Sequence, residues 1–307
     1  MLALQLLCNG VVTGCALGVV AVSFSLIYAT TKIFHVAHAG IYTMGGYITW
    51  SLLNHGLPPV VALTCAVIAC ATAGALIQGL LYARLERRRA THLVVLIASL
   101  GTLAVIQNIL AAIYTPNILR FALPWGSRVI ALGSLGGGTV GSGPMGSGPM
   151  GSGIVRLTWT QVLTVLVSLA AYAGVMWFAH RTMLGKRIRA VASNPFLAEI
   201  TRLRPRVAHV YVVAIASGVV CLPGVLVPLD FGLQPYNGIT PLLTATIAMI
   251  AGGVGSITGA FVLSIVIAEL QNLSLLFIPG EWSIGVTFFI FVIFMLLRPT
   301  GLFAAAR

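Results

Sequence analysis

Residues 180–206, HRTMLGKRIRAVASNPFLAEITRLRPR, separate two long apolar runs and decide how the rest of the chain can fold. The stretch holds seven Lys or Arg against a single acid, Glu199. A charged side chain at the centre of a bilayer costs about 3 kcal/mol or more, so these residues must lie outside the hydrocarbon. The stretch therefore divides the chain into two apolar halves.

The inner pattern of this stretch is typical of a short folded element. Residues 186–193, which follow Gly185, favour one helix. Asn194-Pro195 ends that helix and starts another, because proline disfavours the helical conformation of the residue before it and suits a first helical turn. Two interpretations are open: a loop that orients its neighbours by the positive-inside rule, or a helix on which a cytoplasmic partner docks.

The composition excludes a soluble domain. Of the 307 residues, 59% are hydrophobic and 7% are charged, which indicates a polytopic membrane protein surrounded by lipid. The net charge of +12 does not predict a nucleic-acid partner, because the basic residues cluster at the ends of apolar runs. The five cysteines lie in or beside apolar segments without the spacing of a disulfide or zinc site. The start, MLALQLLCNG, lacks the features of a removed signal peptide.

Nine apolar segments are candidates to cross the roughly 30 Å of hydrocarbon, which needs about 20 residues of helix. They are residues 5–28, 34–53, 59–82, 92–114, 158–179, 207–229, 239–251, 255–276 and 282–298. The seventh is too short for an ordinary span and is predicted to be broken or re-entrant. The sequence thus predicts an all-α fold, a single helical bundle over residues 1–307 with about eight or nine transmembrane helices.

The basic residues predict the topology. If residues 180–206 are cytoplasmic and the spans alternate, 14 of the 17 Lys and Arg lie inside, the N-terminus is periplasmic and the C-terminus is cytoplasmic. Residues 115–157 then face the periplasm, where 121–132 and 154–158 can pair as a hairpin. Its glycine-rich tip repeats GSGPM at 141–145 and 146–150, a flexible pattern to which we assign no chemistry.

The two halves are predicted to form an inverted repeat, because four spans precede the fifth and four follow it. In such transporters the substrate path tends to lie where corresponding helices are short or interrupted by Gly and Pro. The second span opens with FHVAHAG and carries Gly45-Gly46, and its counterpart is the short seventh span. Gly45 and Gly46 fit either close helix packing or a kink beside the path.

Polar side chains within the second span are candidates to line that path. His38 and Tyr42 lie at helical spacing in an apolar segment, where polar groups usually face a cavity or a partner. His35 lies nearer the predicted inner interface and can equally extend toward water beside Lys32. Two histidines without a third ligand do not make a metal site, so we predict none.

Catalytic motifs are missing from the sequence. Gly185-Lys186 lacks the rest of a P-loop, and there is neither a nucleophile elbow nor an HExxH pair. If ATP drives this protein, another chain must hydrolyse it. The rival class, an ion-coupled secondary transporter, needs an acid or cation site in mid-bilayer, and Glu269 is its one candidate.

Several motifs together resemble the permease family of bacterial ABC importers for branched-chain amino acids, the LivH and LivM type. They are HVAHA at 35–39 with GGY at 45–47, LIASLG at 96–101, RTMLGK at 181–186 with RAVASN at 189–194, the glycine-rich residues 252–260, and the ending LRPTGLF at 297–303. The resemblance covers nearly the whole chain. The RAVASN element and the ending are its most specific parts.

The resemblance implies an ATP-driven importer subunit of the bacterial inner membrane that binds no cofactor itself. ATP and Mg would be used by separate ABC ATPase subunits, and the further partners would be a second permease, a copy or a paralogue, and a periplasmic substrate-binding protein. It assigns ATPase docking to Gly185, Arg187, Arg189, Ala190, Asn194 and Ala198. His35, Ala39 and Gly40 depart from the family pattern, so urea, short amides or carboxylates remain alternative substrates.

Overall fold

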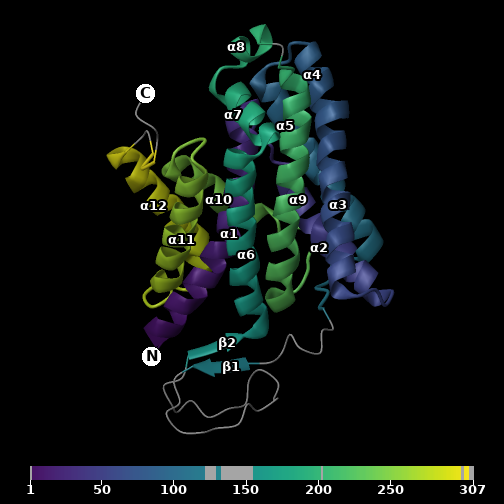
Figure 1. Cartoon of the computed structure of the whole chain (residues 1–307). Helices are drawn as coiled ribbons and strands as arrows, with labels where there is room; N and C mark the ends of the chain where they lie inside the picture. The colour runs from purple at the N-terminus through teal and green to yellow at the C-terminus, as the bar shows by residue number, and fades with distance from the viewer. Residues whose placement is uncertain (1, 122–128, 133–154, 202, 299–300, 304–307) are drawn as a thin grey trace.

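The computed structural model describes residues 2–121, 129–132, 155–201, 203–298 and 301–303, which form a bundle of helices with a two-stranded hairpin at one end (Figure 1). The elements are α1 (Leu2–Thr31), α2 (His38–Asn54), α3 (Pro59–Leu76), η1 (Ile77–Tyr82), α4 (Ala83–Arg87), α5 (His92–Tyr114), β1 (Val129–Leu132), β2 (Val155–Thr158), α6 (Trp159–Arg181), α7 (Met183–Ser193), α8 (Pro195–Ile200), α9 (Pro205–Phe231), α10 (Ile239–Gly252), α11 (Ile257–Ser274), η2 (Gly280–Trp282) and α12 (Ser283–Leu297).

The predicted membrane bundle of helices is confirmed. In the described chain, six helices are long and apolar enough to cross a membrane: α1, the continuous Pro59–Arg87 helix, α5, α6, α9 and α11. Two shorter apolar helices, Ile239–Gly252 and Gly280–Leu296, accompany them. At about 1.5 Å per residue, the 14 residues of α10 reach only about 21 Å, less than the thickness of the hydrocarbon.

The start of the second helix differs from the prediction. We expected a helix from residue 34, but α2 begins at His38. Lys32 has a positive φ of 56°, which turns the chain out of α1, and residues 33–36 adopt neither helix nor strand. His35 therefore precedes α2, and its side chain does not follow the helical spacing of His38 and Tyr42.

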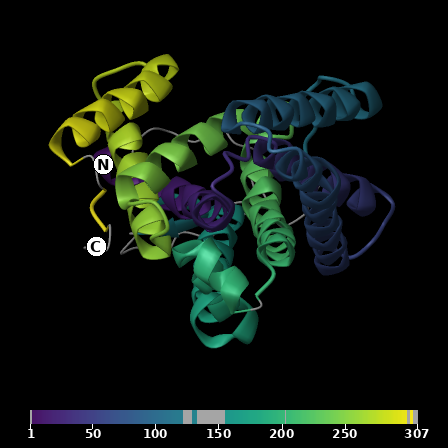
Figure 2. The ribbon, with the colours of Figure 1, turned by 90° about the horizontal axis from the view of Figure 1, so that it is seen from above.

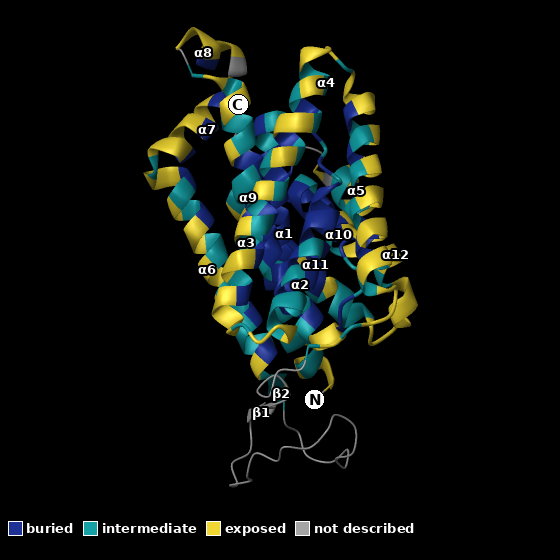
Figure 3. Cartoon of the chain, turned by 90° about the vertical axis from the view of Figure 1, so that its right-hand side faces the viewer, coloured by how far each residue is buried: buried dark blue, intermediate teal, exposed yellow. Residues whose placement is uncertain are grey.

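Helix α1 forms the centre of the bundle. Its residues 14–27 are buried, and the views from the side and from above both show it enclosed by other helices, whereas α12 lies at the periphery (Figures 2 and 3). Glycines at 10, 14 and 18 face α11, and a Cβ on Gly14 would lie 2.7 Å from the Cα of Ile265. Glycine spacing of four residues thus lets the two backbones approach closely.

The packing of the second half repeats that of the first. Helices α1, α2, α3 and α5 of the first half correspond to α9, α10, α11 and α12 of the second. The contact of α1 with α11 therefore corresponds to that of α9 with α3, and the contact of α2 with α9 to that of α10 with α1. The pairs α2 with α3 and α2 with α5 recur as α10 with α11 and α10 with α12, while α6 contacts both α1 and α9. In this correspondence between the two halves, the short helix α2 takes the place of the short helix α10.

The two ends of the bundle carry different elements. The N-terminus and the hairpin lie at one end, and α4, α7 and α8 lie at the other (Figure 1). The strands pair antiparallel from Val129↔Thr158 to Leu132↔Val155, as the sequence predicted for part of this region. The GSGPM repeat lies outside the described residues. Gln5 of α1 holds the hairpin, because its Oε1 accepts from the Arg156 amide at 2.8 Å and its Nε2 donates to the Arg156 carbonyl at 2.9 Å.

Residues 301–303 pack against the end of α10. The amides of Leu302 and Phe303 donate to the carbonyls of Ala251 and Gly252, at 3.0 and 3.1 Å. Gly301, at φ 87°, lies so close to the loop after α10 that a Cβ would be 2.5 Å from the Cα of Gly253. The ending and the glycine-rich loop therefore form one local structure, which caps the last carbonyls of α10.

Candidate functional site

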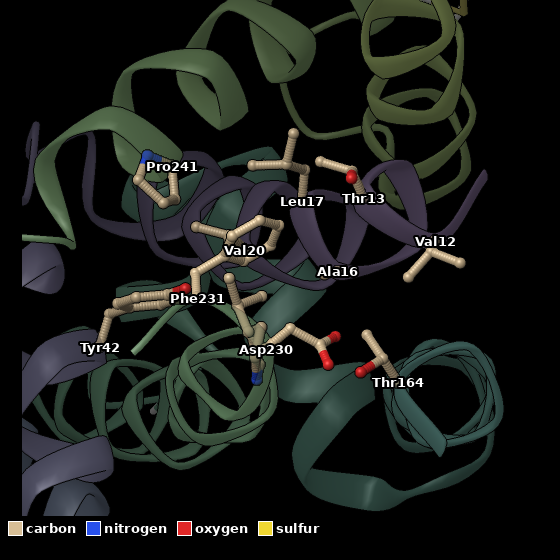
Figure 4. A pocket seen from close by; sticks show the side chains of 12 residues that line it. Val12, Thr13, Ala16, Leu17, Val20, Tyr42, Thr164, Asp230, Phe231 and Pro241 are labelled. Atoms are coloured by element: carbon tan, nitrogen blue, oxygen red, sulfur yellow. The ribbon is translucent and has the colours of Figure 1, made fainter. Parts of the chain in front are cut away.

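A cavity of about 100 Å³ lies where α1, α2, α6, α9 and α10 meet (Figure 4). Most of its wall is apolar, and its lining residues are Val12, Thr13, Ala16, Leu17, Val20, Tyr42, Thr164, Pro223, Val227, Asp230, Phe231 and Pro241. A single water needs roughly 10–15 Å³. The cavity therefore has room for several waters or for one small solute with an aliphatic group.

Asp230 is the only acidic residue among the described residues that line the cavity. It lies in the last turn of α9, and its Oδ1 accepts hydrogen bonds from the Thr160 hydroxyl and, at 3.5 Å, from the Thr158 hydroxyl. Thr158 also caps α6, because its hydroxyl accepts from the Gln161 amide at 3.2 Å. The strand that leaves the hairpin thus continues directly into the residues that hold Asp230.

Of the candidate path residues, Tyr42 lines this cavity. His35 and His38 do not belong to its lining, and both side chains are 0% exposed. Extension of His35 toward water is therefore wrong for this structure. No sequence pattern could have pointed to the α1 wall, since residues such as Val12 and Leu17 are ordinary for any membrane helix.

His35 belongs to a buried hydrogen-bonded chain that joins three segments. Its Nδ1 lies 2.7 Å from the Tyr82 hydroxyl, which donates to the Ser99 hydroxyl at 2.8 Å. Ser99 Oγ also accepts from the Ala37 amide at 3.0 Å. The Tyr82 hydroxyl thus bridges the His35 ring and the Ser99 hydroxyl. The π-helical turn η1 ends at Tyr82 and interrupts the long helix at the residue that meets His35.

His38 makes the equivalent contact to α1. Its Nε2 lies 2.9 Å from Ser23 Oγ, whose proton goes to the Val20 carbonyl at 2.8 Å. His38 therefore donates from Nε2 and keeps Nδ1 as an acceptor. In the described part of the chain, neither His38 Nδ1 nor His35 Nε2 has a hydrogen-bond partner. The two rings, 5.6 Å apart between centroids, fix the irregular entry of α2 against its neighbours.

Removal of the Tyr82 hydroxyl tests this chain of hydrogen bonds. We expect Tyr82→Phe to lower the free energy of unfolding by about 1 kcal/mol or more, because the buried Nδ1 of His35 loses its hydrogen-bond partner. Thermal unfolding of the purified protein in detergent measures the change. Tyr28→Phe is the matched control, since the half-buried Tyr28 makes no side-chain hydrogen bond to described residues. Equal melting of both variants would contradict the expectation.

Gly45 and Gly46 lie at the crossing of α2 with α9. A Cβ on Gly45 would be 2.6 Å from the Cys221 sulfur, and a Cβ on Gly46 would be 2.7 Å from the Gly224 carbonyl oxygen. Neither glycine belongs to the cavity lining. The contacts favour close helix packing, one of the two alternatives that the sequence left open.

The 180–206 stretch forms two helices at the end of the bundle opposite the hairpin (Figure 1). The break falls at Asn194, as predicted, and Asn194 Oδ1 caps α8 by accepting from the Leu197 amide at 3.0 Å. The first helix starts earlier than predicted, at Met183, because the Thr182 hydroxyl accepts from the Gly185 amide at 3.0 Å and caps it.

The predicted docking residues divide into two groups. Arg187, Arg189, Ala190 and Asn194 are exposed, whereas Gly185 and Ala198 are buried. A Cβ on Gly185 would lie 2.8 Å from the Cα of Ala179, so this glycine sets the close approach of α7 to α6. Gly185 and Ala198 therefore shape the element, and a partner would meet the exposed group.

An open groove and apolar side chains adjoin the exposed arginines. The groove, about 490 Å³, runs between α7 and the start of α9 and includes Arg187, Arg204 and Tyr211. On α8, Phe196 is 73% exposed and Ile200 is 64% exposed. Large apolar side chains beside basic ones at the end of a membrane bundle are typical of a surface that another protein covers.

The candidate groups of the rival classes lie elsewhere. Glu269 of α11 is half-buried against Gly10 and is not part of the cavity lining. Among the described residues, no three His, Cys, Asp or Glu gather in a group that could hold a metal ion. The site is thus a largely apolar cavity with one carboxylate, at a distance from a basic element that projects from the bundle.

Known proteins are similar to this chain in sequence and in fold. LivH, the permease of the high-affinity branched-chain amino acid transport system of Salmonella typhimurium, is 25% identical over 97% of this chain and 94% of its own length. BraD, its counterpart in Pseudomonas aeruginosa, is 23% identical over 97% of this chain and 95% of its own. The solved structure of PsaBC from Streptococcus pneumoniae in complex with Fab covers 95% of this chain and 91% of that chain at 12% identity, with a TM-score of 0.50, which shows a common fold.

The family described as branched-chain amino acid transport system / permease component matches residues 6–295. That range includes the helices of the cavity and the whole basic element. The chain is therefore a multi-pass membrane protein that belongs to the family of branched-chain amino acid transport system permeases.

Proposed function

We propose that this protein is the permease subunit of an ATP-driven importer for branched-chain or related amino acids in a bacterial inner membrane. It moves its substrate through the bundle without any covalent chemistry. The observation that carries the proposal is the family match over residues 6–295, together with the relatives LivH and BraD, which match over nearly their whole length. The apolar wall of the cavity suits an aliphatic side chain better than urea.

The partners follow from this role. Separate ABC ATPase subunits, using ATP and Mg, dock on α7 and α8, a second permease completes the membrane part, and a periplasmic binding protein delivers the substrate. Arg187, Arg189 and Ala190 contact the ATPase, and Gly185 keeps α7 close to α6. Closure of the ATPase pair then moves α6, which packs against α1 beside the cavity. A nucleotide can move the permease only if the ATPase contacts differ between two states.

The orientation follows from the same docking surface. The end with α4, α7 and α8 faces the cytoplasm, and the N-terminus and the hairpin face the periplasm. Exposed arginines in α4 and α7 support this orientation by the positive-inside rule. The halves form an inverted repeat of nine spans, with α6 between them, and the corresponding packing of α2 and α10 supports that relation.

Reconstitution tests the proposed function. The permease, coexpressed with the ATPases and the binding protein of its own operon, should purify as a complex and, in liposomes, accumulate leucine when ATP is supplied. Uptake of urea, of short amides and of 4-methyl-2-oxopentanoate is measured in parallel. Leucine uptake that requires ATP agrees with the proposal. Uptake by the chain alone, driven by an ion gradient, would overturn it and direct attention to Glu269.

A further inference from the structure

Besides its α-carboxylate, a branched-chain amino acid presents two different groups to a transporter. Its aliphatic side chain needs an apolar wall, and its α-ammonium group needs an acceptor, preferably an ionised one, because charge-assisted hydrogen bonds are about twice as strong as neutral ones. Urea and simple carboxylates have no ammonium group. The position of acidic side chains along the cavity therefore distinguishes these substrate classes.

Asp230 is the acid that meets this requirement. It lies on a wall shared with Val12, Leu17 and Phe231, and Figure 4 shows its carboxylate between α9 and α6 at the side of the cavity. Both described hydrogen bonds to it use Oδ1, which leaves Oδ2 available to a ligand. Within the described residues, no Lys, Arg or His forms an ion pair with it.

The protein also fixes Asp230 in place. The Thr160 side chain, 2% exposed, donates to Oδ1 from the second residue of α6, and Thr158 donates from the end of β2. Asp230 is exposed, so a ligand can reach its carboxylate. A carboxylate that is already oriented loses less freedom on binding a cation than one that is free to move. Glu269, the acid of α11, lies at the α1–α11 contact and outside the cavity.

We propose that Asp230 binds the α-ammonium group of the amino acid at the hairpin end of the cavity, with Thr158 and Thr160 as its positioning residues. The inference rests on the proposed function and deepens it, since it restricts the substrate to molecules with an ammonium group next to an aliphatic chain. A carboxylate at this position repels a substrate that is itself only a carboxylate, and it offers urea no charge to pair.

Binding to the full-length chain in lipid nanodiscs tests the site without the partners. Ligand-observed NMR titrations use leucine, 3-methylbutylamine, which keeps the ammonium, and 4-methylpentanoate, which lacks it. Wild-type protein should bind the first two, and Asp230→Asn should weaken both by about tenfold or more. Asp230→Glu keeps the charge and should lose less. Glu269→Gln, which removes one negative charge outside the cavity, should bind like wild type.

Two results would overturn the site: equal leucine binding by Asp230→Asn and wild type, or tighter binding of 4-methylpentanoate than of the amine to wild type. Uptake in the reconstituted importer separates this inference from the proposed function. If wild type imports leucine and Asp230→Asn imports it at the same rate, the site is wrong and the function stands. If wild type imports urea, a short amide or 4-methyl-2-oxopentanoate and no amino acid, both are wrong.

Discussion

Replacement of Gly45 by leucine is expected to unfold the bundle or to prevent its assembly in the membrane. The Cβ alone would lie 2.6 Å from the Cys221 sulfur and 3.3 Å from the Cys221 Cα, so the larger side chain must push α2 away from α9. Overpacking of this kind costs about 3 kcal/mol or more when backbone has to move. The yield of monodisperse protein and its thermal unfolding in detergent measure the effect.

Two further variants show whether Gly45 acts through packing. Gly174→Leu on α6 is the matched control, because a Cβ at Gly174 meets nothing within 4 Å, and it should accumulate normally. The milder Gly45→Ala should be rescued by Cys221→Ala, which removes the sulfur in its way. If the double variant stays as impaired as Gly45→Ala, the glycine acts through the path and the packing explanation is wrong.

Charge reversal of Arg187 and Arg189 is expected to uncouple transport from ATP hydrolysis. Both side chains are exposed on α7, so the double variant to glutamate should leave the fold and its melting temperature unchanged. The arginines are proposed to face acidic groups of the ATPase, and glutamates would place like charges opposite each other, which costs several kcal/mol. Binding of the ATPase should therefore fall by about tenfold or more. Pull-down of the ATPase by the purified variant and ATP-driven uptake in liposomes measure the loss.

Arg87 and Arg88 provide the control for this experiment. They are exposed at the same end of the bundle, and their reversal changes the net charge by the same amount. We expect this pair to affect ATPase binding less than the α7 pair. An equal loss in both double variants would indicate a general effect of charge or of membrane orientation, and unchanged uptake in the α7 variant would remove the docking role of α7.

Local chemistry in the sequence predicted the elements outside the membrane. Asn194-Pro195 ends one helix and starts the next because its effect on the backbone depends on neighbouring residues alone. A hairpin of 121–132 with 154–158 was predicted in the same way, from two short segments on either side of a glycine-rich tip, and 129–132 pairs with 155–158. Hydrophobic content alone placed the chain in a membrane, since it does not depend on how the helices pack.

Helix ends and partners inside the bundle could not be predicted in this way. His35 was expected to share a helix with His38, but α2 begins only at His38. His35 lies in the irregular segment before it, against Tyr82, 47 positions later in the chain. Nearly all residues of these segments are apolar, so the pattern contains little that distinguishes one helix face from another. The helix that each glycine contacts also depends on how two segments, distant in the sequence, cross in the folded bundle.

The sequence by itself determined the membrane bundle, the basic element between the halves, the hairpin pairing and the resemblance to the permease family, because composition, turn residues and motifs act locally. Only the tertiary structure decided the cavity and the place of Asp230 in its wall. Five helices from both halves contribute to that cavity, and each contributes residues that are ordinary for a membrane helix. A site of this kind exists only where the helices meet, so no single segment of sequence can show it.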